Sequence, residues 1–332
     1  MLCQFRDAPL KILLVGGAGF IGKRLTHLLL EAGHEVRALS RQARSAHGGN
    51  SKLEWLQLDL LDRSSDLDAA VEGCSLVFNC AGELRNEALM EALHVDATAR
   101  LLAASKRQAK ISGRPLHWVQ LSSVGAYGPP VCASAERTIT EESLPAPRGA
   151  YEVTKTKADD LVIGNAQPGV LTVSILRPSN VFGPGMPNGS LRQWGRIIQR
   201  RLFFYVGAPG AVSTYVHVDD VVEALLLCGF APAAQGQVFN LSNDCTQEEL
   251  VEAMARHLGA GRPFVRLPEV LARALVAGGS WLERFPLTQA RVDSLVGRTH
   301  YDCQKLESVL GYRPSRAIPD YISEVFINDE AN

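Results

Sequence analysis

The sequence lacks the cysteine pattern of a disulfide-bonded or zinc-binding protein. Its 332 residues include seven cysteines, an odd number, and these are scattered and never form a CxxC pair. Disulfide frameworks use even numbers of cysteines, and structural zinc sites use closely spaced pairs. No cluster of histidines and carboxylates has metal-ligand spacing either. We therefore expect free thiols, no metal, and a reducing, cytoplasmic location.

Long apolar runs and an excess of one charge are lacking as well. The opening residues MLCQFRDAPLK have no apolar signal-peptide segment, and no run approaches the roughly 20 apolar residues that span a bilayer. Lysine and arginine number 34 against 35 acidic residues, so no overall field attracts nucleic acid or an anionic membrane. We expect a soluble protein whose partner is a small molecule.

What the chain does contain is a regular alternation of apolar strands and amphipathic helices. Helices are expected after residue 20, at 89–105 and at 151–163. Strands are expected at 11–15, 34–40, 53–60, 74–82, 116–123 and 170–178. This rhythm predicts an α/β fold with a doubly wound parallel (Rossmann) sheet, which binds ligands at the carboxyl ends of its strands.

A change of texture marks a second, smaller lobe. After Pro178 comes the glycine- and proline-rich segment NVFGPGMPNGS, followed by a segment with several arginines. We expect the dinucleotide-binding domain to span 10–180, with 215–242 returning to it. The substrate-binding lobe is then discontinuous and comprises 181–214 and 243–330.

A glycine loop follows the first predicted strand. GGAGFIG places Gly16, Gly19 and Gly22 between a strand and a helix that begins near Phe20 and Ile21. Glycines let backbone N–H groups approach a pyrophosphate, and the positive end of the helix points at its charge. The spacing and context predict a dinucleotide site.

The end of the second strand bears on which dinucleotide binds. An NAD site usually has an acidic residue there for the ribose 2′-hydroxyl. This chain has Ser40, Arg41 and Arg44 instead, and a guanidinium favours a 2′-phosphate. We expect NADP rather than NAD.

A tyrosine and a lysine lie one helical turn apart in GAYEVTK. A free tyrosine has a pKa near 10, so proton transfer at neutral pH needs a nearby positive charge, which Lys155 can give Tyr151. Ser122 and Ser123 end the fifth strand, where such a sheet does its chemistry. We expect a phenol pKa well below 10.

With these motifs the chain resembles the extended short-chain dehydrogenase/reductases, which include NAD(P)-dependent epimerases, dehydratases and ketoreductases. The resemblance covers nearly the whole chain, through GGAGFIG, LDLLD, NCAG, LSSVGAYG, YEVTK, RPSNVFGPG, YVHVDDVVEAL and YDCQKLESVLGYRP. It implies an enzyme, expected as a homodimer, with Ser123, Tyr151 and Lys155 as catalytic residues. It also implies cofactor contacts at Asp59, Leu60, Cys80, Ala81, Gly82, Pro178 and Asn180, besides the glycine loop, Tyr151 and Lys155.

Two positions depart from the family pattern. His94 stands where many members have asparagine in a helix, which alters a contact behind the active site. Ser213 stands where many nucleotide-sugar enzymes have arginine. The second departure weakens the case for a sugar nucleotide.

Substrate contacts are predicted at five positions, namely Glu83, Ser123, Asn180, Arg192 and Arg291. Arg192, Arg196 and Arg200 recur at helical spacing and could clamp a diphosphate, although a solvated helix face is the commoner outcome. Arg291 and Arg298 are a further candidate clamp.

Three functions remain open at this stage. The first is an NADP-dependent nucleotide-sugar 4-ketoreductase or epimerase. The second is a reductase or dehydrogenase of an apolar, sterol-like or flavonoid-like compound. The third is a dinucleotide-sensing protein without turnover, against which the intact Ser123, Tyr151 and Lys155 argue.

Overall fold

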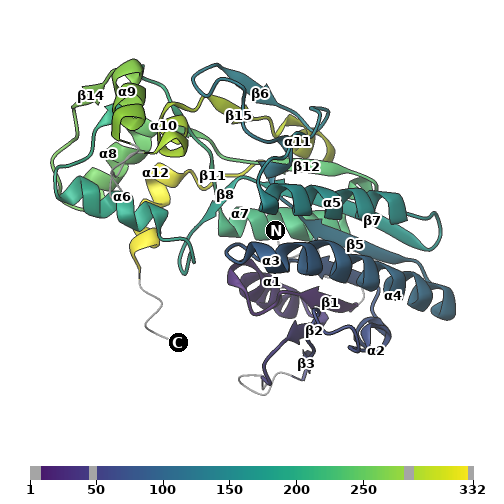
Figure 1. Cartoon of the computed structure of the whole chain (residues 1–332). Helices are drawn as coiled ribbons and strands as arrows, with labels where there is room; N and C mark the ends of the chain where they lie inside the picture. Colours follow the sequence, from purple (N-terminus) through teal and green to yellow (C-terminus); the bar gives the residue numbers. More distant parts are fainter. Residues whose placement is uncertain (1–8, 45–50, 280–287, 328–332) are drawn as a thin grey trace.

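The central sheet of the computed structural model consists of seven parallel strands, as the sequence predicts. The structure describes residues 9–44, 51–279 and 288–327 (Figure 1). The strand order is β12-β7-β5-β4-β1-β2-β3, and all neighbours are parallel. The strands are β1 (Lys11–Val15), β2 (Glu35–Ser40), β3 (Leu53–Gln57), β4 (Leu76–Asn79), β5 (Leu116–Leu121), β7 (Leu171–Pro178) and β12 (Val238–Leu241).

Helices cover both faces of the sheet because successive strand residues point to opposite sides. In β1, Ile12 and Leu14 face one core, while Leu13 and Val15 face the other. The first core is closed by α1 (Phe20–Glu31), α7 (Val218–Phe230) and α11 (Gln304–Leu310). The second is closed by α2 (Leu67–Val71), α4 (Ala97–Ser112) and α5 (Ala150–Asn165).

The helix expected at 89–105 is longer than predicted and is interrupted. It begins as α3 (Glu87–Glu91), where Asn86 caps the N-terminus, passes through a π-helical turn at Ala92–Asp96 and continues as α4. Gly113 ends α4 in the left-handed region at φ 64°. Single π-helical turns inside α-helices are frequent at functional sites. This one carries His94.

A second group of elements packs beside the carboxyl edge of the sheet, to the left in Figure 1. Its core joins Phe182, Met186 and Leu191 to residues of α8 and of the chain end. Three parallel pairs, β8–β11, β6–β15 and β9–β14, and the antiparallel pair β10–β13 connect segments that are distant in the sequence. The remaining elements are β6 (Arg137–Ile139), β8 (Asn180–Phe182), α6 (Ser190–Gln199), β9 (Tyr205–Val206), β10 (Val212–Ser213), β11 (Tyr215–His217), β13 (Cys245–Thr246), α8 (Gln247–His257), β14 (Arg266–Leu267), α9 (Glu269–Gly279), α10 (Gln289–Val296), β15 (Thr299–Tyr301) and α12 (Ile318–Tyr321), with 3-10 turns at Val124–Tyr127, Pro232–Ala234 and Ile322–Phe326.

The packing bears on the proposed division into two lobes. β12 joins the sheet and α7 covers it, whereas β11, at the start of 215–242, pairs with β8. Leu306 of α11 and Tyr312 also pack into the first core, although 243–330 is assigned to the second lobe from the sequence. We propose the two lobes with α11 packed on the first.

In the part of the chain that the structure describes, no helix combines the length and apolarity needed to cross a membrane. Six cysteines there are free thiols, and Cys3 lies outside the described residues. Over the same residues, no group of three or more His, Cys, Asp or Glu side chains could hold a metal ion.

Candidate active site

The glycine loop lies where β1 meets α1 and leaves no space for side chains. Gly16 has φ +83°, and a Cβ there would lie 2.8 Å from the carbonyl carbon of Cys80. A Cβ on Gly22 would lie 2.1 Å from the Gly16 oxygen, so α1 starts in close contact with the loop. Gly19 caps the helix in an extended conformation without a side chain. The backbone here can come close to a bound anion.

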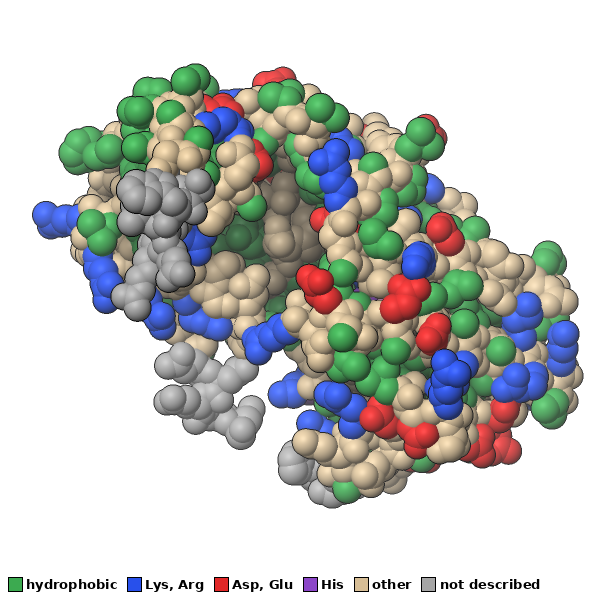
Figure 2. Space-filling model, viewed as in Figure 1, with side chains coloured by type: hydrophobic (Ala, Val, Ile, Leu, Met, Phe, Trp, Pro, Cys, Tyr) green, Lys and Arg blue, Asp and Glu red, His purple; other side chains and the backbone are tan. Residues whose placement is uncertain are grey.

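A cleft of about 1010 Å³ opens above this loop at the carboxyl edge of the sheet. Figure 2 shows the surface hollowed between the two groups of elements. Most cofactor residues predicted from the sequence line it: Gly16, Gly19, Phe20, Ile21, Gly22, Cys80, Ala81, Gly82, Tyr151, Lys155, Pro178 and Asn180. The volume and the glycine cradle fit a dinucleotide with space left for a substrate.

The two adjacent serines after β5 have different surroundings. Ser122 is 3% exposed, and its hydroxyl donates to Asp159 Oδ2 at 2.7 Å. Ser123 is half-buried, and its Oγ accepts the Gly125 N–H at 3.1 Å. Ser123 also forms a hydrogen bond with Tyr151. This geometry favours Ser123 as the serine that contacts a substrate oxygen, because Ser122 is committed to a buried carboxylate.

The phenol of Tyr151 does not have the lowered pKa expected from the sequence. Burial and, to a smaller extent, the charge of Asp159 raise its pKa to about 12, although the hydrogen bond from Ser123 acts in the opposite direction. The prediction is therefore wrong for the chain alone. The prediction from the sequence included the positive charge of Lys155 but not the negative charge of Asp159, one helical turn further on, which raises the phenol pKa.

Lys155 is a buried residue at the wall of the cleft. It is 3% exposed, and its ammonium donates to the Leu121 carbonyl at the end of β5. Burial lowers the pKa of Lys155, and the Asp159 carboxylate opposes that effect. The ammonium thus links α5, which carries Tyr151, to the end of β5, just before Ser123.

Asp159 anchors a buried polar network behind these residues. Its Oδ2 accepts Arg177 Nε at 3.0 Å as well as Ser122, and Arg177 reaches the Tyr127 hydroxyl at 3.1 Å. Within the described residues, Asp159 Oδ1 has no hydrogen-bond partner. Burial raises the pKa of Asp159, and Arg177 opposes this. Asp159 was not among the residues predicted from the sequence, although its spacing of four from Lys155 puts both on one helix face.

His94 contacts the catalytic helix from the π-helical turn. Its Nε2 accepts the Glu83 N–H at 2.8 Å, so the neutral ring carries its proton on Nδ1, which lies 2.8 Å from Thr154 Oγ1. Its ring stands edge-on to Tyr151, with centroids 5.6 Å apart. Burial, together with Lys155, lowers the His94 pKa to about 4. The histidine is therefore a neutral support for the tyrosine helix.

The predicted adenine-end residues lie at the carboxyl ends of β2 and β3, outside the cleft lining. Ser40 Oγ accepts Arg44 Nε at 3.2 Å, and the Arg44 guanidinium lies 5.3 Å from the Trp55 ring centroid. Arg41 is exposed. Asp59 accepts the Leu61 N–H at 2.9 Å, and Leu60 is 9% exposed.

Only some of the substrate-binding residues predicted from the sequence lie at the cleft. Asn180 lines the cleft with Ser123, and its amide donates to the Thr214 carbonyl at 3.0 Å. Glu83 instead accepts three backbone N–H groups from residues 84–86, which lowers its pKa. Arg192 donates to the Met186 carbonyl at 3.0 Å, and Arg291 is exposed on α10. Of these five, Glu83, Arg192 and Arg291 do not line the cleft.

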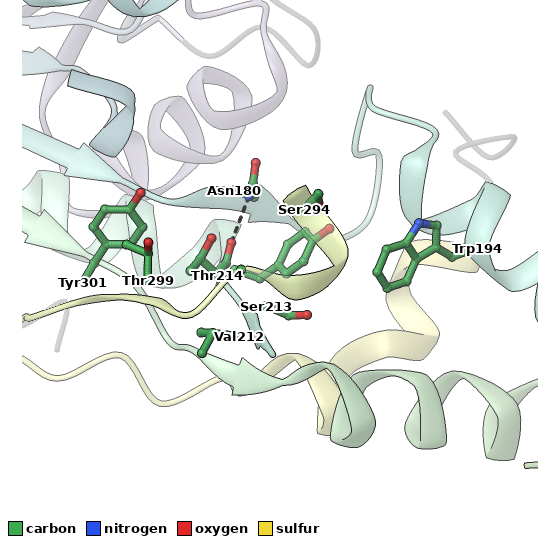
Figure 3. Close-up of a pocket in the computed structure, with 10 residues that line it drawn as sticks. Asn180, Trp194, Val212, Ser213, Thr214, Ser294, Thr299 and Tyr301 are labelled. Atoms are coloured by element: carbon green, nitrogen blue, oxygen red, sulfur yellow. Dashed lines mark hydrogen bonds between the residues drawn. The ribbon is translucent and has the colours of Figure 1, made fainter. Parts of the chain in front are cut away.

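A smaller pocket of about 180 Å³ continues the cleft into the second lobe (Figure 3). Asn180, Thr214 and Tyr301 line both cavities. We call this smaller cavity the lobe pocket; its other walls include Ser213, Ser294, Thr299, Trp194 and Tyr215. Sequence reasoning missed most of these residues, because β10, β11, α6, α10 and β15 meet only in the fold.

Comparison with known proteins identifies the family. The model of the NAD dependent epimerase/dehydratase family matches residues 12–242. The chain belongs to this family. The resemblance seen in the sequence is thereby confirmed, and the protein is an NAD(P)-dependent extended short-chain dehydrogenase/reductase.

The names of similar proteins refer to different substrates. The chain is 28% identical over 294 residues to a 4-hydroxy-2-methyl-3-oxo-4-farnesyl-3,4-dihydroquinoline-1-oxide ketoreductase from Stigmatella aurantiaca, covering 86% of this chain and 84% of that protein. It is 25% identical over 333 residues to a 3-beta-hydroxysteroid dehydrogenase from Mycolicibacterium neoaurum, covering 92% and 87%. The solved structure of MoeE5 in complex with UDP-glucuronic acid and NAD superposes with a TM-score of 0.72 at 25% identity, covering 95% and 97%.

Proposed function

We propose that this enzyme transfers a hydride between NADP and the carbon of a ketone or secondary alcohol, with Tyr151 as acid or base. The observation that carries the proposal is the meeting of Ser123, Tyr151 and Lys155 at one cleft that also contains the glycine loop. When bound, the dinucleotide supplies or accepts the hydride. The known relatives are named as enzymes, which disfavours the sensing protein without turnover.

The residues of the chain bind and orient the substrate and transfer the proton. Ser123 and Tyr151 hydroxyls can hydrogen-bond the carbonyl oxygen from one side and orient it. Tyr151 gives its proton to that oxygen as negative charge develops there. Lys155, whose ammonium donates to the Leu121 carbonyl, supplies positive charge in the cleft that Tyr151 also lines, whereas the carboxylate of Asp159 raises the pKa of the phenol. The glycine loop and Cys80–Gly82 hold the dinucleotide in this arrangement.

The choice of NADP rests on the end of β2. Ser40, Arg41 and Arg44 occupy the stretch where an NAD site usually has a carboxylate. Arg41 is exposed and available to a 2′-phosphate. The MoeE5 structure contains NAD, so both dinucleotides belong in any assay of this chain.

Two substrate classes fit the family. MoeE5 binds a nucleotide sugar, whereas the ketoreductase and the steroid dehydrogenase are named for uncharged ring compounds. Epimerisation and net reduction share the same proton-transfer residues, so the catalytic residues do not distinguish them. A cytoplasmic, homodimeric enzyme remains our expectation; the six described free thiols fit a reducing compartment.

Replacing Tyr151 tests the proposal. Tyr151→Phe removes only the hydroxyl, so kcat should fall by about 10² to 10⁴, while dinucleotide affinity and thermal stability stay close to those of the unchanged enzyme. The readout is nicotinamide absorbance with a reducible carbonyl, and fluorescence titration for binding. Ser123→Ala should also slow turnover, whereas Ser122→Ala should matter less to chemistry. Turnover by Tyr151→Phe at the original rate would remove the tyrosine from the mechanism.

A further inference from the structure

The lobe pocket is lined by uncharged groups. Hydroxyls come from Ser213, Ser294 and Thr299, and rings come from Trp194, Tyr215 and Tyr301 (Figure 3). None of the residues that line it is Lys, Arg, Asp or Glu. Its walls therefore offer aromatic surface and neutral hydrogen-bonding atoms to a ligand.

Two cations near the pocket residues in the sequence are committed to backbone carbonyls, whereas Arg196, two residues after Trp194, is exposed and does not line the pocket. Arg192, two residues before Trp194, donates to Met186 O at 3.0 Å and Val325 O at 3.3 Å. Arg298, between Gly297 and Thr299, donates to the carbonyls of residues 208–210. These guanidiniums hold the loops of the second lobe in place. They belong to its structure rather than to the pocket lining.

The walls of the pocket are supported by the core beneath them. The Trp194 ring packs against Phe203 with centroids 5.6 Å apart, and Tyr215 meets Phe182 edge-on at 6.4 Å. Phe182 and Phe203 belong to the buried core of the second lobe. Two aromatic walls of the pocket are therefore held in place by the core of the second lobe.

Charge and size point to the same ligand. A diphosphate brings negative charge that needs cationic or multiple N–H partners when it is buried. A cavity of about 150 Å³ is large enough for benzene, so 180 Å³ suits a ring-sized group rather than a nucleoside with its phosphates. We propose that the lobe pocket takes an uncharged, ring-bearing part of the substrate and excludes a nucleoside diphosphate.

This inference rests on the proposed function, because the cleft beside the pocket holds Ser123 and Tyr151. It commits the enzyme to neutral cyclic ketones or secondary alcohols. The reacting carbonyl then lies at Tyr151, and the remote ring lies between Trp194 and Tyr301.

Trp194 provides a readout that does not depend on turnover. With NADP+ present, titration with 4-phenylcyclohexanone or trans-1-decalone should change tryptophan emission and raise the thermal midpoint. UDP and UDP-glucose at the same concentrations should do neither. Trp194→Phe should remove most of the emission change while the midpoint shift persists, which assigns the signal to the pocket among the four tryptophans of the chain.

A matched pair of variants tests whether charge is the reason. Ser294 is exposed and lines the pocket, so substitutions there should fold. Ser294→Arg should strengthen UDP binding by about 10- to 100-fold, the range of one charge-assisted hydrogen bond, whereas Ser294→Gln should not. Ser294→Arg should also weaken binding of the neutral ketones.

The outcomes separate the two proposals. UDP binding by the unchanged enzyme more tightly than the ring ketones, or ketones that leave Trp194 emission unaltered, would overturn the inference. No gain of UDP binding in Ser294→Arg would also count against it. Ketones that bind at Trp194 yet are never reduced with NADPH would instead contradict the proposed hydride transfer.

Discussion

His94 connects three parts of the site through a single ring. Its Nε2 accepts a hydrogen bond from the Glu83 N–H, and its Nδ1–H donates to the Thr154 hydroxyl on α5. The ring stands edge-on to the ring of Tyr151. A second proton would place N–H against N–H at the Glu83 contact, which adds to the effect of burial. The ring can serve this position only while it is neutral.

This requirement predicts a pH dependence of stability. The His94 pKa is about 4 in the folded chain against 6.5 for the ordinary side chain, so the unfolded chain binds more protons between these values. Stability should therefore be lost as pH falls from about 6.5 to 4, by about 3 kcal/mol from this group. Urea unfolding across this range should show the loss in the unchanged enzyme and not in His94→Gln.

The matched control is His27, an exposed histidine on α1. His27→Gln should keep the pH dependence of the unchanged enzyme. If His94→Gln and His27→Gln show the same slope between pH 4 and 6.5, then His94 does not carry the effect.

Arg41 decides the dinucleotide in our proposal. Arg41→Ala should weaken NADP binding by about 10- to 100-fold, which corresponds to roughly 1.5 to 3 kcal/mol for a charge-assisted bond to phosphate, and should leave NAD binding nearly unchanged. Fluorescence titration of both dinucleotides measures this. Arg114→Ala, an exposed change at the opposite edge of the sheet, is the control. Equal losses of NAD and NADP affinity would place Arg41 away from the 2′-phosphate.

At the residue scale, local motifs predicted some features and missed others. The glycine loop and the YEVTK turn combine residues close in sequence, so their spacing shows what they face. The Tyr151 pKa also depends on burial and on Asp159, which accepts a hydrogen bond from Arg177 of β7. The effect of burial on this pKa depends on all the groups packed around the phenol, so the spacing of residues in the sequence does not predict it.

Among the elements, α1 depends on the absence of a side chain in its first turn. A Cβ on Gly22 would meet the Gly16 backbone at 2.1 Å, and backbone atoms have no room to move aside. Gly22→Ala should therefore displace α1 from the loop. We expect loss of dinucleotide binding and a drop of 1–3 kcal/mol in the free energy of unfolding, as is typical of overpacking.

Gly164 of α5 gives the opposite case. A Cβ there meets nothing within 4 Å among the described residues, so Gly164→Ala should stabilise the helix by about 0.5–1 kcal/mol. Urea unfolding and dinucleotide titration of both variants measure the contrast. A Gly22→Ala enzyme with unchanged affinity would mean that the loop tolerates a side chain.

The strands of the main sheet could be predicted from the sequence, whereas the short strands of the second lobe could not. The strands of the sheet are four to eight residues long and rich in apolar residues, and those up to β7 were identified from the sequence. The strands of the second lobe have two or three residues each, and β8 pairs with β11 across 35 positions. Strands this short are too short to show an alternating apolar pattern in the sequence. They form because a partner strand in the fold supplies their hydrogen bonds.

For the molecule as a whole, a buried ion pair attaches the C-terminal segment to α7. Asp220 is 0% exposed and accepts Arg316, the Arg316 amide and the Tyr312 hydroxyl, while Glu223 accepts the same guanidinium at 2.9 Å. Since α7 packs on the sheet, this contact fixes the chain end to the first lobe just before it enters the core of the second.

Removing the guanidinium should loosen this attachment. Arg316→Ala leaves the Asp220 carboxylate buried with fewer partners, and we expect a loss of about 1–3 kcal/mol in unfolding free energy. Arg313→Ala, an exposed arginine three residues earlier, should change it by less than about 0.5 kcal/mol. Chemical denaturation measures both, and equal losses would show that the ion pair contributes nothing specific.

The placement of β12 also has a consequence for how the chain folds. This strand, at Val238–Leu241, completes the sheet beside β7, and the second-lobe core then combines residues from 182–205, 250–255 and 318–325. Contacts between the first and the last of these segments join positions more than a hundred residues apart, so loop closure must precede them and slows folding. We expect the sheet to be assembled first and the lobe pocket to be the last part of the native structure to form.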